Sequence, residues 1–280
     1  ARDNNVSEDM IRRAEAVGLS TLVVTVDVPV HSNRERNTRN GFTRPLKMSL
    51  ETRLDALSHP SWMMGYLRQG MPMIKNWLPY AKDGATADDV ANLVTAQVTA
   101  PLTWDNIARY RDLWPRNLVI KGIMHVDDAV KAAEVGVDGI VVSNHGARQL
   151  DRSPASLEVL PGIVAAVGDR LTVMLDSGVQ RGSDIVTALC LGAKFVFTGR
   201  ATLYGLTAGG KPGAAKAIGI LNNEIDLVMA QMGAADFVNI CCGVIEHIGS
   251  ADFVNICCGV RPKMENKNIG KICGGVWPEV

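Results

Sequence analysis

A dense group of polar and basic residues lies between positions 143 and 151, where the sequence reads SNHGARQLD. His145 could act as a base, and Arg148, three residues further on, could hold an anion in the same cavity. Two earlier residues could assist, since Asp27 could stabilise a protonated His145 and Arg34 could provide a second positive group. Together these residue types support proton abstraction from a small carboxylate. The competing interpretation is that His145 is a structural histidine.

A second polar group spans positions 176–184, with the sequence DSGVQRGSD, and is followed by Gly199 and Arg200. Glycines let backbone N–H groups approach an anion closely, the helix expected to start near Ser183 adds its positive dipole end, and arginines supply charge. Loops after the last two strands of a (β/α)8 barrel are the usual phosphate site of that fold. We therefore expect a phosphate-bearing ligand here, with ordinary turn chemistry as the alternative.

The elements that must position these residues repeat one pattern, in which an amphipathic stretch ends at a glycine and a short apolar run follows. Such runs are typical of parallel strands buried on both faces, and a glycine can end a helix in the left-handed conformation. The glycines are Gly18, Gly136, Gly168 and Gly192, and the expected strands are residues 21–26, 118–120, 139–142, 171–175 and 195–198. A helix is expected at 104–113, closed by Pro115.

This rhythm of strand and helix predicts an α/β fold, either a (β/α)8 TIM barrel or a doubly wound sheet. The two folds differ in where polar residues fall, because all strands of a barrel end at one mouth. Every expected strand here ends in polar groups, namely Thr25 with Asp27, Lys121, Ser143 to His145, Asp176, and Gly199 with Arg200. The sequence therefore favours the barrel.

The composition of the 280-residue chain is that of a folded protein, with 47% hydrophobic and 21% charged residues. Because 29 Lys and Arg balance 29 Asp and Glu, there is no excess of positive charge to attract nucleic acid. The six cysteines include no CxxC pair, so we expect no metal site and a reducing, cytoplasmic setting. No apolar run approaches the roughly 18 residues that a membrane span requires.

Two segments depart from the rhythm of strand and helix. Residues 46–90 form an insertion that is rich in Trp, Tyr and Met but is interrupted by charged residues. It is expected to be either a lid or oligomer contact over the barrel mouth, or an interfacial patch that touches a membrane through aromatic anchors. Residues 236–280 form an atypical tail in which the ten residues 235–244 recur as 251–260. We expect this tail to contribute little to the fold or to catalysis.

The run at positions 143–151 resembles, over its full length, the active-site signature of the FMN-dependent α-hydroxy acid dehydrogenases and oxidases. The resemblance extends from about residue 6 to residue 235 and includes DSG at 176–178 and GRATLYGL at 199–206. It implies that residues 1–235 are the C-terminal part of an FMN-binding TIM barrel. It also implies oxidation of a small (S)-2-hydroxy acid, of the lactate or mandelate type, to the 2-oxo acid.

The resemblance implies a role for each matching residue. His145 would be the catalytic base with Asp27 as its partner, and Arg148 and Arg34 would hold the substrate carboxylate. The residues that would contact the flavin ring are Thr25, Lys121 and Ser143, with Lys121 near N1 and O2. The residues that would hold the ribityl phosphate chain are Asp176, Ser177, Gly178, Val179, Gln180, Arg181, Gly199 and Arg200.

Two departures from the family pattern lead to further expectations. The family usually has arginine at the position of Gln180, so FMN should bind more weakly unless Arg181 and Arg200 compensate. The N-terminal third of the pattern, about three strands, has no counterpart, so the chain would represent the barrel from about its fourth strand onward. We expect either another chain to fill the gap or the sequence to be a fragment.

Other functions stay open from the sequence. One is another FMN barrel enzyme, such as a type 2 isopentenyl diphosphate isomerase or an inosinate-type oxidoreductase, against which the spacing of His145 and Arg148 argues. Another is a truncated, non-catalytic barrel remnant. For the oxidising enzyme, the electron acceptor is open between oxygen and a membrane quinone or cytochrome. We also expect a homo-oligomer, with peripheral contact to the inner face of the cytoplasmic membrane as a further expectation.

Overall fold

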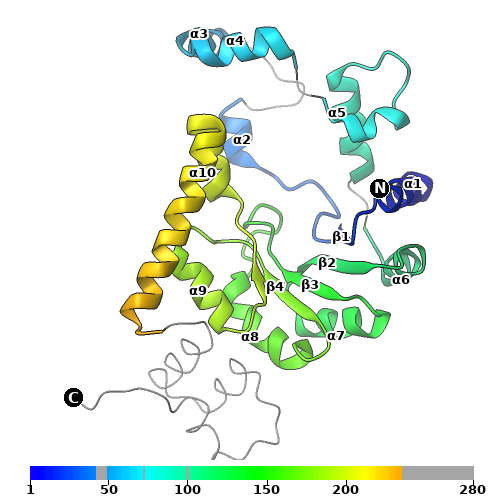
Figure 1. Ribbon diagram of the computed structural model, residues 1–280. Helices are drawn as coiled ribbons and strands as arrows, with labels where there is room; N and C mark the ends of the chain where they lie inside the picture. Colours follow the sequence, from blue (N-terminus) through cyan, green and yellow to red (C-terminus); the bar gives the residue numbers. More distant parts are fainter. Residues whose placement is uncertain (42–48, 72, 99–100, 235–280) are drawn as a thin grey trace, which may run out of the picture. The chain divides into compact units, whose positions relative to one another are not determined.

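The computed structural model describes residues 1–41, 49–71, 73–98 and 101–234 (Figure 1). These residues form two compact units. The smaller unit comprises the described residues of Ala1–Val17 and Val28–Leu102, and the larger unit comprises Gly18–Asp27 and the described residues from Thr103 onward. The atypical tail at 236–280 lies outside the described residues.

The larger unit is built on a five-stranded parallel sheet whose strands follow chain order, β1-β2-β3-β4-β5. The strands are β1 (Thr21–Thr25), β2 (Asn117–Ile123), β3 (Gly139–Val142), β4 (Thr172–Leu175) and β5 (Phe195–Val196). All five expected strands are confirmed, although β5 is shorter than the apolar run at 195–198.

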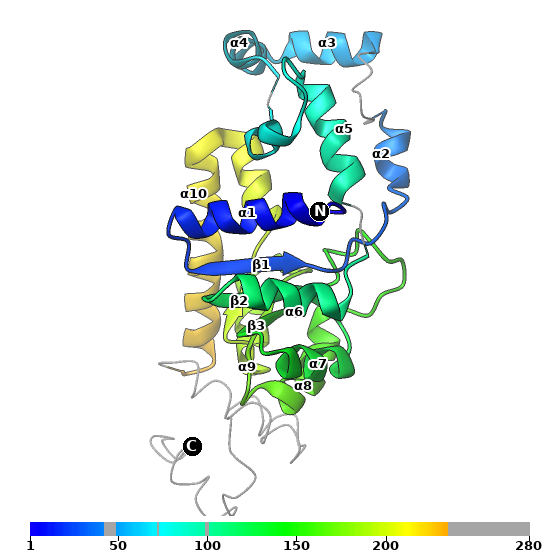
Figure 2. The same cartoon turned by 90° about the vertical axis from the view of Figure 1, so that its right-hand side faces the viewer.

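Helices alternate with these strands and lie to one side of the sheet (Figures 1 and 2). They are α6 (Trp104–Leu113), α7 (Val126–Val135), α8 (Ser156–Val167), α9 (Gly182–Cys190) and α10 (Arg200–Gln231). A doubly wound sheet reverses its strand order at a crevice, whereas this order runs in one direction without reversal. The larger unit is therefore an α/β fold of the expected kind, part of a TIM barrel.

The burial of the strands explains why the apolar runs fold as they do. Every residue of β3 is buried, and so are residues 118–120 of β2. The largest fully buried side chains of the larger unit are Trp114, Leu118, Ile120, Ile140, Leu160, Ile163 and Leu175. Since these come from the strands, from α8 and from the end of α6, the core lies between the sheet and its helices.

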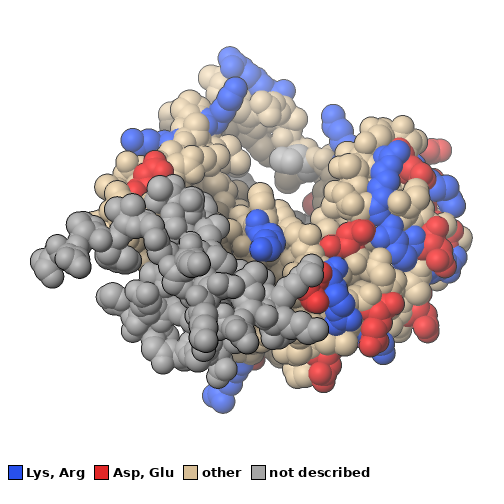
Figure 3. Space-filling model, turned by 60° about the horizontal axis from the view of Figure 1, so that its bottom comes forward, with Lys and Arg blue, Asp and Glu red and all other residues tan. Residues whose placement is uncertain are grey.

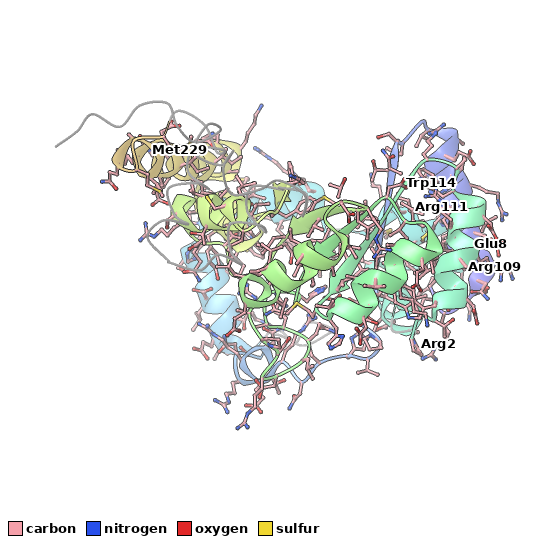
Figure 4. All side chains as sticks on the ribbon, turned by 90° about the horizontal axis from the view of Figure 1, so that it is seen from below. Arg2, Glu8, Arg109, Arg111, Trp114 and Met229 are labelled. Atoms are coloured by element: carbon pink, nitrogen blue, oxygen red, sulfur yellow. The ribbon has the colours of Figure 1, made fainter. Side chains whose placement is uncertain are left out.

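The connection from α6 to β2 is fixed by polar contacts around Arg111 and Trp114, which lie together at the end of α6 (Figure 4). One guanidinium nitrogen of Arg111 donates to Asp138 Oδ2 at 2.7 Å, and the other donates to the backbone carbonyls of Trp114 and Arg116. The same Asp138 oxygen accepts the N–H of Leu118 at 2.7 Å. These contacts tie the beginning of β2 to the residue that precedes β3.

The glycines expected to end helices follow the pattern with one correction. Gly18, Gly136 and Gly192 have φ values of 80°, 83° and 99°, so each adopts the left-handed conformation. The same expectation for Gly168 is wrong, because its φ is −65°. A Cβ at this position would lie 2.6 Å from the carbonyl oxygen of Val164. Gly168 is thus required by close backbone packing and not by a left-handed turn.

The helix expected at 104–113 is confirmed at the ends that the sequence predicted. It begins after Thr103, whose hydroxyl accepts the N–H of Asn106 while the Asn106 side chain accepts the N–H of Thr103. The last helix, α10, is interrupted at Gly209 and Gly210, where the backbone is not helical. Its second arm packs against Val186 and Cys190 of α9, and Met229 belongs to this arm (Figure 4).

The smaller unit is helical. Its elements are α1 (Asn4–Ala16), α2 (Glu35–Arg39), α3 (Leu50–Ser58), α4 (Pro60–Gln69), the 3-10 helix η1 (Lys75–Tyr80) and α5 (Ala87–Val98). The hydroxyl of Tyr80 donates to Asp9 at 2.5 Å, and Arg13 donates to the carbonyl of Asn76 at 3.2 Å. These two contacts join α1 to η1.

Helices α3 and α4 expose much of their apolar surface and contain no buried residue. Their exposed large apolar side chains are Leu50, Leu54, Leu57, Trp62, Met64, Tyr66 and Leu67. The rings of Trp62 and Tyr66 stack with centroids 5.5 Å apart. Among the described residues, none of the helices is both long enough and apolar enough to span a bilayer.

Charged side chains are mixed on the face shown in Figure 3, where Lys and Arg lie beside Asp and Glu over the described part of the surface. This mixture agrees with the formal net charge of +0. On this face, the charge pattern offers no extended positive surface for a polyanion.

Candidate active site

The carboxyl ends of β2, β3, β4 and the loop after β5 border a cavity of about 1010 Å³ in the larger unit. The predicted site residues that line it are Lys121, His145, Arg148, Asp176, Ser177, Gly178, Val179, Gln180, Arg181, Gly199 and Arg200. They come together because neighbouring parallel strands end at the same edge of the sheet. The two polar groups of the sequence thus share one cavity.

His145 and Asp27 form a hydrogen-bonded pair at this edge. The Nδ1 atom of His145 lies 3.1 Å and 3.3 Å from the two carboxylate oxygens of Asp27. The Asp27 side chain is only 14% exposed and the His145 side chain is 31% exposed, so the ring keeps a free edge. A carboxylate on Nδ1 selects the tautomer that leaves Nε2 available as a base and stabilises the ring when Nε2 takes a proton.

The backbone of Gly122 lies directly against the Asp27 side chain, a contact that the sequence did not predict. Its φ is +109°, and a Cβ at this position would lie 2.7 Å from both Cβ and Cγ of Asp27. Only glycine leaves room for the carboxylate in its observed place. The available signal was a glycine inside the apolar run of β2, which often marks close backbone approach.

Lys121, Ser143 and Asp176 form a second polar cluster beside the pair. The Lys121 Nζ donates to Ser143 Oγ at 2.8 Å and lies 3.0 Å from Asp176 Oδ2. Burial acts to raise the pKa of Asp176, but hydrogen bonds from Ser143, Ser177 and Lys121 outweigh it and lower that pKa from its ordinary value. Asp176 is therefore held as a carboxylate that fixes the Lys121 ammonium at the cavity wall.

The backbone that carries His145 is unusual. His145, Gly146 and Ala147 are three consecutive residues with positive φ, at 59°, 67° and 55°. Left-handed conformations at non-glycine residues are uncommon and often occur at functional sites. The N–H of His145 donates to Ser143 Oγ at 3.1 Å, and the N–H of Gly146 donates to Ser177 Oγ at 2.8 Å.

The beginning of α10 also borders the cavity. The first N–H groups of a helix have no partner within the helix, so those that follow Gly199 have the chemistry to receive an anion. The guanidinium of Arg200 adds positive charge there and donates to the carbonyl of Gly146 at 2.5 Å. A Cβ on Gly146 would lie 2.8 Å from this guanidinium. The loop of His145 and the start of α10 are therefore in direct contact.

The beginning of α9 is already paired with acidic side chains of the chain itself. Arg181 donates to Glu224 at 2.8 Å, and the N–H of Gly182 donates to the same carboxylate at 2.8 Å. The N–H groups of Gln180 and Arg181 both donate to Asp184 Oδ2 at 2.9 Å. The two bonds to Glu224 lower the pKa of its carboxyl group, with the Gly182 N–H as the largest cause and the Arg181 guanidinium next.

The role of Glu224 was not anticipated, because a single glutamate on a helix carries no sequence signal. We expected Arg181 to compensate for the charge that is missing at Gln180. In the structure the Arg181 guanidinium is bound to the Glu224 carboxylate, which would compete with a phosphate for it. Gln180 itself is exposed at the cavity wall.

Four predicted site residues are not among those that line the cavity. Asp27 and Ser143 lie behind it, bonded to the lining residues His145 and Lys121. Thr25 ends β1 opposite Lys121 in the strand register and is exposed. Arg34 belongs to the smaller unit, where its Nε donates to Ser32 Oγ at 3.2 Å. Within the described residues, no group of three or more His, Cys, Asp and Glu side chains is placed to hold a metal ion.

Comparison with known proteins identifies a matching family. The model of the FMN-dependent dehydrogenase family matches residues 1–246. The chain is 40% identical over 235 residues to the (S)-mandelate dehydrogenase of Pseudomonas putida, which covers 84% of this chain and 59% of that relative. It is 38% identical over 240 residues to an L-lactate dehydrogenase of Caulobacter vibrioides, which covers 85% of this chain and 62% of the relative.

Solved structures agree with these relatives. The crystal structure of the monotopic membrane protein (S)-mandelate dehydrogenase matches with a TM-score of 0.79 and 40% identity, over 84% of this chain and 62% of that one. A mandelate oxidase structure matches with a TM-score of 0.63 and 33% identity, over 83% of this chain and 57% of that one. The chain thus spans about three fifths of the length of the proteins it matches.

Proposed function

Because this chain belongs to the FMN-dependent dehydrogenase family, we propose that it provides the catalytic base and the phosphate site of an enzyme that oxidises an (S)-2-hydroxy acid to the 2-oxo acid. The single observation that carries this proposal is the pairing of His145 with Asp27 in the cavity that Lys121 also lines. In such an enzyme His145 would remove a proton from the substrate, and the fixed positive charge of Lys121 would stabilise negative charge that develops nearby.

The residues around the cavity fit FMN by their chemistry. The volume of about 1010 Å³ suffices for a ligand of this size. Lys121 offers a donor where a ring with carbonyl oxygens would lie, while the start of α10 and Arg200 offer positive charge to a phosphate. When bound, FMN would supply the acceptor for the two electrons that leave the substrate.

Each predicted residue then has a proposed task. His145 would take the substrate proton at Nε2, and Asp27 would stabilise the resulting imidazolium. Arg148, which lines the cavity, and Arg34 would orient the substrate carboxylate. Thr25, Lys121 and Ser143 would border the ring, and the phosphate chain would lie along Asp176, Ser177, Gly178, Val179, Gln180, Arg181, Gly199 and Arg200.

Reduction of bound flavin by substrate tests the proposal directly. The parent protein, loaded with FMN under anaerobic conditions, should lose its oxidised flavin absorbance when (S)-lactate or (S)-mandelate is added. His145→Gln should keep the flavin spectrum but slow reduction by about 10²- to 10⁴-fold, because the base acts on the substrate. His125→Asn is the matched control, since Asn can replace the helix-capping His125 on α7. Equal reduction rates in the parent and His145→Gln would remove His145 from the mechanism.

The relatives differ in substrate, since their names include both mandelate and L-lactate dehydrogenases. We propose that the substrate of this protein belongs to these two types of 2-hydroxy acid. The ratio of kcat/KM for the two acids, measured on the same flavin-loaded preparation, decides between them. A homo-oligomer and a quinone or cytochrome as electron acceptor remain part of the proposal.

We also propose that helices α3 and α4 contact a membrane surface peripherally, on the inner face of the cytoplasmic membrane. Support comes from their exposed Leu, Trp, Met and Tyr side chains and from the structural match to a monotopic membrane protein. The competing role is a lid or oligomer contact. Cosedimentation with phospholipid vesicles should be lost in Trp62→Ser with Leu67→Ser, whereas a change in oligomer size without a change in cosedimentation would favour the other role.

A further inference from the structure

The turn formed by His145, Gly146 and Ala147 depends on contacts from outside these three residues to hold its shape. Only Gly146 adopts a left-handed conformation without strain, while His145 and Ala147 carry side chains at φ values of 59° and 55°. Three such residues in a row need external contacts to hold them. The identity of these contacts therefore decides where the imidazole of His145 lies.

Some of the contacts come from within the same loop. The N–H of Ala147 donates to the side chain of Asn144 at 3.0 Å, and the N–H of His145 donates to Ser143 at 3.1 Å. The N–H of Gly146 is different, because its acceptor is Ser177 Oγ, at 2.8 Å, in the loop after β4. Ser177 thus ties the turn to a neighbouring strand.

Ser177 is itself held in a costly conformation. Its φ is 82°, which a residue with a Cβ rarely adopts. Its hydroxyl has a single hydrogen, which is donated to Asp176 Oδ1 at 2.7 Å. That donation leaves the oxygen lone pairs for the N–H of Gly146. Asp176 in turn lies 3.0 Å from the Nζ of Lys121. An unbroken chain of polar contacts therefore runs from Lys121 to the turn.

We propose that Ser177 is a positioning residue for His145, acting through the Gly146 peptide, in addition to any contact it makes with cofactor. Its hydroxyl connects the Lys121–Asp176 ion pair to the turn, so the cation and the base keep a constant separation. The description of His145 as a base rests on the function proposed above. The mechanical part, that Ser177 holds the turn, does not.

The test uses four variants of the whole chain and two readouts from nuclear magnetic resonance. Ser177→Ala removes the hydroxyl, and Ser177→Gly removes both the hydroxyl and the backbone strain. Ser177→Thr keeps a hydroxyl but adds a β-branched carbon, and therefore strain, at a φ of 82°. Ser183→Ala is the matched control, because Ser183 is an exposed serine in the first turn of α9. The readouts are hydrogen exchange of the Gly146 amide and the resonance of the His145 Nδ1 proton that faces Asp27.

We expect the Gly146 amide to exchange about tenfold faster in Ser177→Ala and in Ser177→Gly, because its acceptor is lost. The His145 Nδ1 proton signal should broaden or disappear in both variants and should persist in Ser177→Thr and Ser183→Ala. Ser177→Gly should melt no lower than Ser177→Ala, since relief of the positive φ offsets the lost bond. This comparison separates loss of the hydroxyl from general destabilisation, and Ser177→Gly still decides the question if Ser177→Ala does not fold.

Unchanged amide exchange and an unchanged His145 signal in Ser177→Gly would overturn the inference, whatever the flavin chemistry shows. A third readout links the inference to turnover, because kcat for flavin reduction should fall in Ser177→Ala while KM changes little. If instead the parent flavin is not reduced by 2-hydroxy acid, the proposed function fails, and the resonance data still establish or refute the role of Ser177.

Discussion

The two ends of the cavity use acidic side chains in opposite ways. At the end that holds His145, each carboxylate serves a group that faces the cavity, since Asp27 orients the imidazole and Asp176 anchors Lys121. At the beginning of α9, Asp184 and Glu224 instead accept hydrogen bonds from Gln180, Arg181 and Gly182, so these donors are already paired beside the phosphate position that we propose.

At the His145 end, the polar groups that face the cavity are already oriented before a ligand binds. At the α9 end, the hydrogen-bond donors are already paired with carboxylates of the chain itself. Preorganised groups contribute more to catalysis because they need little rearrangement when charge develops. Donors that are already paired contribute less to binding, since a ligand must replace an existing bond. Substitutions at the His145 end should therefore change mainly the rate of flavin reduction, and substitutions at the beginning of α9 should change mainly the affinity for FMN.

The largest effect should follow from Asp27→Asn at the preorganised end. An amide cannot stabilise the imidazolium and can favour the wrong tautomer, so flavin reduction should slow by about 10²- to 10⁴-fold. FMN affinity should stay within about twofold, because Asp27 is not among the residues that line the cavity. Stopped-flow reduction and flavin titration measure the two quantities. Asp128→Asn, an exposed carboxylate on α7, is the control. A parallel loss of FMN affinity would mean that the two ends are not independent.

Gly122→Ala should disturb the same end through sterics. Its Cβ would lie 2.7 Å from Asp27 at a φ of +109°, so we expect a loss of about 1–3 kcal/mol in the free energy of unfolding. Gly219→Ala is a matched control, since Gly219 lies in α10 with nothing within 4 Å of an added Cβ. That control should be neutral or stabilising by up to about 1 kcal/mol. Urea unfolding distinguishes them, and equal losses would contradict the close packing of Gly122 on Asp27.

The sequence predicted much of the fold because the strands are short apolar runs separated by helices at regular spacing. The predicted end of α6 was correct because Pro115 follows it, and the structure adds a local capping pair, Thr103 and Asn106, at the beginning. Gly168 was misjudged because glycine can serve either a left-handed turn or a close backbone approach, and only the backbone conformation at the end of α8, where Gly168 lies against the Val164 carbonyl, shows which one applies.

The residues of the site were predictable where they follow strands, because sequence position alone brings them to one edge. Glu224 was not predictable, since its contact with Arg181 joins residues 43 positions apart in the chain and follows from the packing of α10 on α9. The hydrogen bond from the Gly146 N–H to Ser177 was not predictable either, because a serine hydroxyl in a turn has many possible partners nearby. Only the packing of the loop after β3 against the loop after β4 brings these two residues together.

Glu224→Gln tests the end that the chain occupies itself. The variant removes the negative charge that competes for Arg181, so FMN should bind about three- to tenfold more tightly relative to riboflavin, which lacks the phosphate. Asp226→Asn, an exposed carboxylate on the same helix, controls for net charge. In the double variant Glu224→Gln with Arg181→Gln the gain should vanish. Quenching of flavin fluorescence measures both affinities, and an unchanged ratio would place Arg181 outside the phosphate position.

The smallest effect should be a pH dependence of stability due to Asp176. Its pKa is lowered in the folded protein, so the carboxylate stabilises the fold above its unfolded pKa of about 3.9, and this contribution is lost as pH falls through the folded value. The parent should melt about 2–4 °C above Asp176→Asn between pH 5 and pH 7, which corresponds to about 1 kcal/mol. Below about pH 4 the difference should shrink as the carboxylate takes up a proton. Calorimetry across this range measures it, with Asp128→Asn as control. A difference that persists unchanged at pH 3 would show that Asp176 stabilises the fold by packing and not by its charge, and the contrast between the two ends would then rest on Asp27 alone.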